Sequence, residues 1–543
     1  MTPSIYGRLR VYILPLSTVD FQLCVGVLLN DVDHTITITS LPGEVVEEIL
    51  LMLAEYPISI AAFAQSCASF YALIYRASDD HFWRELFLTI YDDPRTASHL
   101  SLPAPHRETL KPEWKSSFQQ RAQALNGLTK PKEGSILETE SQQSTSTIGD
   151  RCHLFLALLS IIKGAPQAIS LVPTNSCPIS RFLRGNHRGG VHPLVIASEN
   201  TFKLPPPQWF SEIGPSKNVQ ILDHISLPDM SRLLDECHRT LEVLRRPGFN
   251  HPPANYEACE FVTIYGWPET YQDIRAIEDG CPKSTPSAFL DAHHKVFSME
   301  YPRYTRAYGP FLQREGEVQK SSDLKPDWEH LAAVRLVVQS AILNELGAKS
   351  HPILRGAAAT RPGAWIPPFP EPVEPESPES GKTNHDRDWA GVEGIWRRMA
   401  VWIPYSILLN YNTGETEPKN ATGAQRYEYA PLMLKVTGFR HDGLVHDEFP
   451  TILFEGHMGG EEWDEKAIEN DMTPDIVAVE GSVSLLLDGS ISFDDIQKVN
   501  PQFLFEGVQI GGIGSLAGAL GTWTNSEHSA TDPVGPWWQW RVA

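Results

Sequence analysis

The chain has 543 residues, of which 41% are hydrophobic and 21% are charged, and its formal net charge is -22. A chain of this length is too long for one hydrophobic core, so we expect about three domains. The hydrophobic and charged fractions are ordinary for globular proteins, so we expect most of the chain to fold. The negative charge argues against a nucleic-acid partner, because phosphates need a basic surface. No apolar run reaches the roughly 20 residues of a transmembrane helix, so we expect no membrane partner.

The seven cysteines are scattered and include no Cys-x-x-Cys pair. This usage is typical of a reducing compartment, in which thiols act as small hydrophobic groups. The sequence therefore predicts a cytoplasmic or nuclear protein, or one found in both compartments.

We interpret residues 1–38 as an N-terminal extension and residues 39–95 as a compact unit of three helices. Pro42 suits a first helical position, because its missing N–H would have no partner there, and Glu44 lies where the helix dipole favours an anion. Apolar residues then recur at helical spacing up to Leu53, and we expect Pro57 to stop this helix.

A second helix is expected over Ile60–Ile74 and a third, short one around Trp83, after the start signal Asp79-Asp80. Fewer than 50 residues with three apolar faces make a poor independent core. We therefore expect part of this apolar surface to contact another protein.

The stretch from Leu41 to Leu86 resembles an F-box, the module that joins a substrate receptor to a ubiquitin ligase. The resemblance implies that one face of the unit docks onto a Skp-type adaptor, and through it onto a cullin-RING ligase. Ala68-Ser69 departs from the basic residues that many members carry after the Cys, and the alternative is an ordinary three-helix packing unit. The residues expected to contact the adaptor are Leu41, Pro42, Glu44, Ile49, Leu50, Leu53, Ile58, Phe63, Cys67 and Trp83.

The next part of the chain is predicted to be mainly helical. Residues 96–129 form a helical extension with an amphipathic helix over 114–128, and residues 130–150 read as a polar, Ser/Thr-rich linker. Residues 151–350 form a mainly helical middle region, with helices expected at 153–162, 230–244 and 328–346. Residues 351–387 are rich in Pro and Glu and predict an extended spacer.

Strand signals dominate residues 388–543. Leu432, Leu434 and Val436 alternate with more polar residues, which is the period of a half-buried strand. Asp488-Gly489 between two alternating segments predicts a hairpin. Further strands are expected over 503–510, 518–524 and 537–542, and several short strands at regular spacing indicate a barrel or sandwich.

A recurring tripeptide of a large apolar residue, Glu and Gly favours an antiparallel barrel, because glycines within strands allow sharp bends. It occurs at 392–394, 454–456, 479–481 and 505–507. The strand order and the aromatic last strand resemble a lipocalin or calycin-type barrel, from which the acidic insertion at 461–475 departs. The predicted fold is thus multidomain α+β: an F-box, a mainly helical middle and a C-terminal antiparallel, lipocalin-like β-barrel.

Tryptophans are the candidate binding residues of the barrel, since each combines a large apolar face with one hydrogen-bond donor. Eight of the 14 lie here, at 389, 396, 402, 463, 523, 537, 538 and 540. Trp538 and Trp540 should point one way along their strand and Trp537 the other. Most will fill the core, and those assigned to a substrate pocket are Trp396, Trp523, Trp538 and Trp540.

No catalytic, metal or cofactor site is expected. Gly512–Ala517 mimics a dinucleotide-binding glycine motif but lacks the helix that should follow, so we interpret it as a hairpin connection. His441, His446, His457 and His528 lack the spacing of a metal centre. The chain is therefore predicted to be non-catalytic.

The sequence predicts the substrate-recognition subunit of a Skp-cullin-F-box ubiquitin ligase, in which the barrel holds a target protein or its degron peptide. The alternative is a lipocalin-like barrel for a small molecule or lipid, with an F-box-like helical unit attached.

Overall fold

The structure is a computed structural model. It describes residues 41–97, 112–129, 145–164, 216–224, 256–266, 287–299, 310–312, 324–346, 388–441, 449–459, 476–498 and 503–541, except positions 78, 487, 514, 516, 528 and 530. The predictions for 1–38, 130–144, 230–244, 351–387 and 461–475, and those for His446 and His528, lie outside these residues. The chain divides into two compact units, which are described separately.

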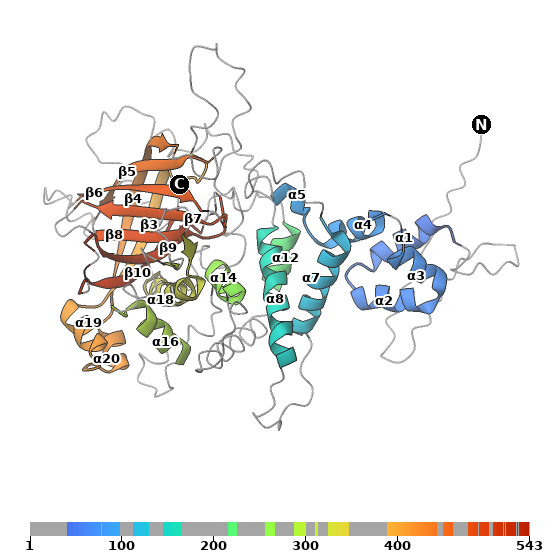
Figure 1. Cartoon of the computed structure of the whole chain (residues 1–543), viewed down its shortest axis with the longest axis horizontal. Helices are drawn as coiled ribbons and strands as arrows, with labels where there is room; N and C mark the ends of the chain where they lie inside the picture. The colour runs from blue at the N-terminus through green and yellow to red at the C-terminus, as the bar shows by residue number, and fades with distance from the viewer. Residues whose placement is uncertain are drawn as a thin grey trace, which may run out of the picture. The chain divides into compact units, whose positions relative to one another are not determined.

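The first unit contains four helices and the residues 114–118 (Figure 1). The helices are α1 (Gly43–Met52), α2 (Pro57–Ser66), α3 (Ala68–Tyr75) and α4 (His81–Ile90). Leu50, Leu86 and Phe87 are completely buried and form its centre. The helical unit expected from the sequence is therefore present, although it has four helices where three were expected.

The extra helix arises at Cys67, which interrupts the expected second helix. Its backbone is extended, with φ -157° and ψ 160°, and its Sγ accepts the N–H of Phe70 at 3.5 Å as the cap of α3. The apolar spacing continues across this break, so periodicity alone does not reveal it. Pro57 also differs from the expectation: α1 has already ended at Met52, and Pro57 begins α2.

The second unit starts with a set of helices, of which α14 and α16 pack against α18, the helix that supports the barrel. These are α5 (Pro94–Ala97), the remainder of α7 (Trp114–Thr129), α8 (Thr145–Lys163), α12 (Lys217–His224), α14 (Tyr256–Tyr265), α16 (Ser287–Val296) and α18 (Trp328–Leu346), with the short strands β1 (Phe311–Leu312) and β2 (Lys325–Pro326). Helix α8 begins at Thr145, inside the predicted linker, whereas α18 has the predicted bounds. Among the described residues, no helix is long and apolar enough to cross a membrane.

Asp92 holds the start of α12 in place from a distant part of the sequence. Its carboxylate accepts the hydroxyl of Ser216 at 2.5 Å and the backbone N–H groups of Lys217 and Asn218 at 3.1 and 3.0 Å. The free N–H groups at the beginning of a helix require such acceptors. Asp92 therefore acts as the N-terminal cap of α12.

Eight antiparallel strands form a closed barrel in the order β10-β3-β4-β5-β6-β7-β8-β9 (Figure 1). Their bounds are β3 (Gly394–Trp402), β4 (Arg426–Arg440), β5 (Thr451–Gly459), β6 (Ile476–Leu485), β7 (Ile491–Gln497), β8 (Phe503–Gln509), β9 (Ala519–Asn525) and β10 (Val534–Arg541). The predicted barrel is confirmed. Helices α19 (Tyr405–Asn412) and α20 (Pro418–Gly423) lie between β3 and β4, and the predicted hairpin at Gly489, with φ +84°, joins β6 to β7.

The glycines of the repeated tripeptide allow the strands to approach closely around large rings. A Cβ at Gly481 would lie 2.2 Å from the Asp494 carbonyl oxygen and 2.5 Å from the Phe454 ring. At Gly507 it would lie 2.7 Å from the Leu520 carbonyl oxygen and 2.8 Å from the Trp537 ring. A narrow barrel filled by aromatic residues therefore requires glycine at these positions.

One end of the barrel is closed by the segment that precedes β3. The Trp389 indole donates to the Pro450 carbonyl at 2.7 Å, and Trp396 donates to the Val392 carbonyl at 2.8 Å. Trp389, Ala390 and Val392 are buried members of the barrel core. The other rim, where β3 and β9 end and β8 and β10 begin, carries the connections to α19 and between β9 and β10.

Candidate functional site

The first candidate site is an apolar surface on the four-helix unit. Of the ten large apolar side chains that are exposed in the described part of the chain, five belong to this unit. Met52 is 67% exposed and Ile58 is 61% exposed, although Met and Ile are among the residue types most often buried. The five residues are Val45, Met52, Tyr56, Ile58 and Tyr71.

Helix α1 has apolar residues on two faces, and this is why so many remain exposed. Val46 and Leu50 point into the core of the unit. Val45, half-buried Ile49 and exposed Met52 recur at spacings of four and three residues on another face. We call Val45, Ile49, Met52, Tyr56 and Ile58 the outer stripe, since they follow one another from α1 into the start of α2.

The residues expected to contact the adaptor are divided between surface and core. Pro42, Glu44 and Ile58 are exposed, whereas Leu41, Ile49, Leu53, Phe63 and Cys67 are half-buried. Leu50 and Trp83 are buried in the unit. Sequence reasoning missed Met52, Tyr56 and Tyr71, although their apolar character outside the buried face is a signal that could have identified them.

Trp83 contributes to the core of the helical unit. Its indole N–H donates to the Ile74 carbonyl at 2.8 Å, which ties α4 to α3, and its ring lies 5.9 Å from that of Phe118. The Lys115 ammonium is 5.8 Å from the Trp83 ring centre and 5.1 Å from that of Tyr75. This packing joins α4 to α3 and to the beginning of α7.

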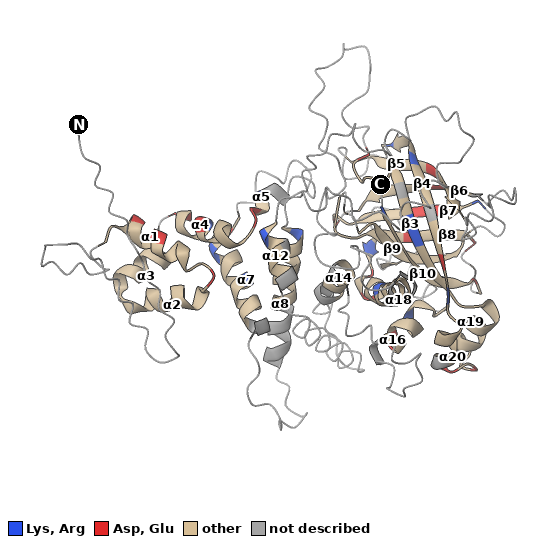
Figure 2. Cartoon of the chain, turned by 180° about the vertical axis from the view of Figure 1, so that it is seen from behind, with Lys and Arg blue, Asp and Glu red and all other residues tan. Residues whose placement is uncertain are grey.

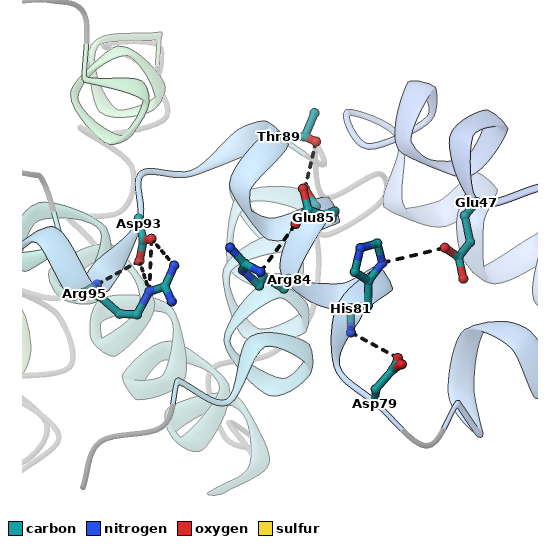
Figure 3. Close-up of polar contacts among 8 residues, drawn as sticks. All are labelled: Glu47, Asp79, His81, Arg84, Glu85, Thr89, Asp93 and Arg95. Carbon is teal, nitrogen blue, oxygen red and sulfur yellow. Dashed lines mark hydrogen bonds and ion pairs between the residues drawn. The ribbon is translucent and has the colours of Figure 1, made fainter. Parts of the chain in front are cut away.

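Charged residues also lie on helices α1 and α4 of this unit (Figure 2). Figure 3 shows the His81 ring of α4 facing Glu47 of α1, with 3.8 Å between Nδ1 and Oε2, and the Arg84–Glu85 pair at 3.9 Å on α4. In the second unit, the same figure shows Arg95 bound to Asp93 at 2.5 Å, and this hydrogen bond raises the pKa of Arg95. These contacts between partly exposed side chains contribute little stability, so we assign them no binding role on their own.

The barrel tryptophans lie in three different places. Trp396 and Trp537 point into the barrel and are buried in its core. Trp538 and Trp540 are also buried, but they lie on the outer face, as the predicted alternation of β10 requires. Trp523 is half-buried at the rim that carries the connection to α19. The structure therefore does not bring the four predicted substrate-binding tryptophans together.

Helix α18 covers the outer face that contains Trp538. The Arg335 guanidinium carbon lies 3.8 Å from the centre of the Trp538 ring, and the His330 Nε2 lies 3.0 Å from the Thr522 hydroxyl of β9. Burial lowers the pKa of Arg335 to about 9. Trp538 is thus a contact between helix and barrel and is not accessible at the surface.

The barrel interior contains a buried ion pair. The Arg398 Nη2 donates to Asp495 Oδ2 at 2.5 Å, and the same guanidinium donates to the Gln539 side-chain oxygen at 2.6 and 3.0 Å. The Phe505 ring centre lies 4.2 Å from the guanidinium carbon. Burial raises the pKa of Asp495, and the charge and hydrogen bond of Arg398 oppose this shift. The large side chains and this pair occupy the interior.

The glycine motif at 512 and the histidines do not form a further site among the described residues. Gly511 and Gly512 have φ of +84° and +82°, and the segment connects β8 to β9, as the hairpin interpretation predicted. His441 and His457 are exposed. No group of three or more potential metal ligands is found in the described part of the chain.

Comparison with known proteins leaves the family open. No protein-family model matches the chain, no curated protein matches it, and no solved structure matches it.

Proposed function

We propose that this protein is the substrate-receptor subunit of a Skp-cullin-F-box ubiquitin ligase. The observation that carries the proposal is the outer stripe, a set of uncovered apolar side chains on a helical unit whose sequence resembles an F-box. A stripe of this kind on a folded unit favours a protein partner, because exposed apolar area is stabilised when another protein covers it.

In this proposal the adaptor covers the outer stripe. Met52, Tyr56 and Ile58 supply one aliphatic-aromatic group near the end of α1, and Tyr71 of α3 supplies a second contact. Large apolar and aromatic residues are the ones that usually dominate binding energy in such interfaces. The buried residues Leu50 and Trp83 hold the helices in the geometry that the adaptor would recognise.

The barrel would then hold the target close to the ligase. The receptor needs no catalytic side chain for this role, since binding raises the local concentration of a target lysine near the activated ubiquitin. The alternative function, a carrier of a lipid or small molecule, requires space inside the barrel. Trp396, Phe493 and Trp537 are fully buried inside it, which favours binding at its surface.

The test is to measure binding of the full-length protein to a purified Skp-type adaptor. Met52→Asp combined with Ile58→Asp would place two unpaired charges in the proposed interface, and we expect affinity to fall by about 100-fold or more. These two residues are better choices than Ile49 and Leu53, whose half-buried side chains also support the fold.

Leu156→Asp is the matched control, because Leu156 is an exposed apolar residue of α8 in the other unit, with 47% exposure. We expect this variant to bind like the unmodified protein. A double variant that keeps its helical content and its affinity would exclude the outer stripe as the adaptor site. Absence of binding by the unmodified protein would reject the proposed function.

A further inference from the structure

The rim of the barrel at which β3 and β9 end carries a second exposed apolar surface. Trp402 at the end of β3 is 39% exposed, and Tyr405 and Leu409 of α19 are 47% and 40% exposed. Tyr405 and Leu409 are four residues apart and therefore share one face of the helix. With half-buried Phe503 and Trp523, they form what we call the rim patch.

Defined contacts join the members of the rim patch. The Trp523 indole donates to the Val401 carbonyl at 2.9 Å, next to Trp402. The Phe503 ring lies edge-on to the Trp523 ring, with 5.6 Å between the ring centres and 88° between the ring planes. A Cβ at Gly535 would lie 2.6 Å from the Trp523 indole nitrogen, so the missing side chain lets this ring reach β3. The Tyr405 hydroxyl donates to the Thr531 carbonyl at 3.0 Å. The patch is thus built from three connected parts of the rim.

The opposite face of α19 fixes the exposed residues in position. Leu408 and Tyr411 are buried, and the Tyr411 hydroxyl lies 3.4 Å from the buried His293 Nδ1 of α16. Asn412 donates to the Phe297 carbonyl at 3.0 Å and accepts the Met299 N–H at 2.8 Å. Because α19 is fastened on this side, Tyr405 and Leu409 remain exposed on an ordered helix.

Exposed acidic residues lie on two connections of the rim that carries the rim patch. Glu415 and Glu417 are exposed between α19 and α20, where Figure 2 shows red residues beside α20, and Glu527 is exposed in the turn between β9 and β10. Arg426, at the beginning of β4, is an exposed cation of this rim. An acidic border favours a basic partner.

We propose that the rim patch binds an extended segment of a partner protein in which apolar side chains alternate with Lys or Arg. Its apolar residues would cover Trp402, Tyr405 and Leu409, and its cations would face Glu415, Glu417 and Glu527. Because large side chains fill the barrel interior, the segment would lie across the rim and not inside the barrel. The role of this segment as the degron of a target rests on the proposed function, whereas the binding itself does not.

The experiment uses the full-length protein and three short fluorescent peptides, with binding measured by fluorescence anisotropy. In the first peptide Leu and Phe alternate with Lys. The second has Glu in place of Lys, and the third keeps Lys but has Ser in place of Leu and Phe. Because the third peptide has the charge of the first, it separates specific binding from general attraction to a chain of net charge -22.

We expect the first peptide to bind at least about tenfold more tightly than either of the others. Trp402→Ser with Leu409→Ser should weaken it by about tenfold, and so should Glu415→Lys with Glu417→Lys, the latter mainly at low salt. Leu156→Ser is the matched control and should leave the affinity unchanged. Equal binding of all three peptides, or full affinity in both rim variants, would overturn the inference.

Adaptor binding, measured on the same samples, keeps the two proposals distinguishable. A protein that binds the adaptor but shows no preference for the first peptide would refute only the rim inference. A protein that binds the first peptide at the rim but not the adaptor would refute only the ligase function.

Discussion

Replacing Arg398 by Met would leave Asp495 without its cation inside the barrel. The two side chains are 1% and 0% exposed, so water cannot replace the lost partner. Removing one member of a buried ion pair costs about 3–5 kcal/mol, because the other charge remains desolvated and unpaired. Total stabilities are about 5–15 kcal/mol, so this substitution should remove a large part of the barrel's stability.

The second substitution tests the reason for that loss. In Arg398→Met with Asp495→Leu, both charges are absent and apolar side chains of similar size occupy the interior. Such replacements are often neutral or stabilising by roughly 1–4 kcal/mol. The double variant should therefore unfold at a higher denaturant concentration than Arg398→Met.

The single variant should also acquire a characteristic pH dependence. Burial raises the pKa of Asp495 and Arg398 lowers it, so loss of Arg398 should raise this pKa further. The folded variant would then retain a proton that the unfolded chain, with a pKa near 3.9, releases. Its stability should consequently fall as pH rises from about 4 through the folded-state pKa.

Urea unfolding of the full-length proteins, followed by tryptophan fluorescence, measures these changes. Eight of the 14 tryptophans lie between residues 389 and 540, so the signal reports mainly on the barrel. A loss below about 1 kcal/mol at neutral pH for Arg398→Met would contradict the reasoning. So would a double variant as unstable as the single one.

Three further changes should alter stability in defined ways. Burial lowers the pKa of His293 to about 3, so lowering the pH from 7 to 5 should reduce the free energy of unfolding by about 2 kcal/mol. In urea unfolding, His293→Phe should have a flatter pH profile than the unmodified protein, and parallel profiles would contradict this. Gly521→Ala should cost about 3 kcal/mol of stability, because its Cβ would lie 1.9 Å from the Glu506 carbonyl oxygen. Gly423→Ala, with open space around it, should be neutral or slightly stabilising. Similar melting temperatures for the two variants would refute the packing argument. Asp92→Ala should cost about 1–2 kcal/mol by removing the cap of α12, measured by thermal unfolding against Asp93→Ala, whose half-buried side chain binds Arg95 and not α12; equal effects would deny Asp92 that role.

The local patterns of the sequence predicted much of the secondary structure. Helix α18 has the predicted bounds, because residues 328–346 are continuously favourable for a helix that is buried on most sides. The alternation at 432–436 and the turn at Gly489 identified strands, since side chains on a strand alternate between its faces. The break at Cys67 escaped prediction, because the apolar spacing is the same on both sides of it.

The sequence by itself determined that β10 has tryptophans on both faces, and that α1 has more apolar residues than one face can hold. Only the tertiary structure decided that Trp537 fills the barrel, that Trp538 lies under α18, and that Met52 stays exposed. A side chain's direction follows from the local backbone. What covers it depends on segments far away in the sequence, and their packing is a property of the whole fold.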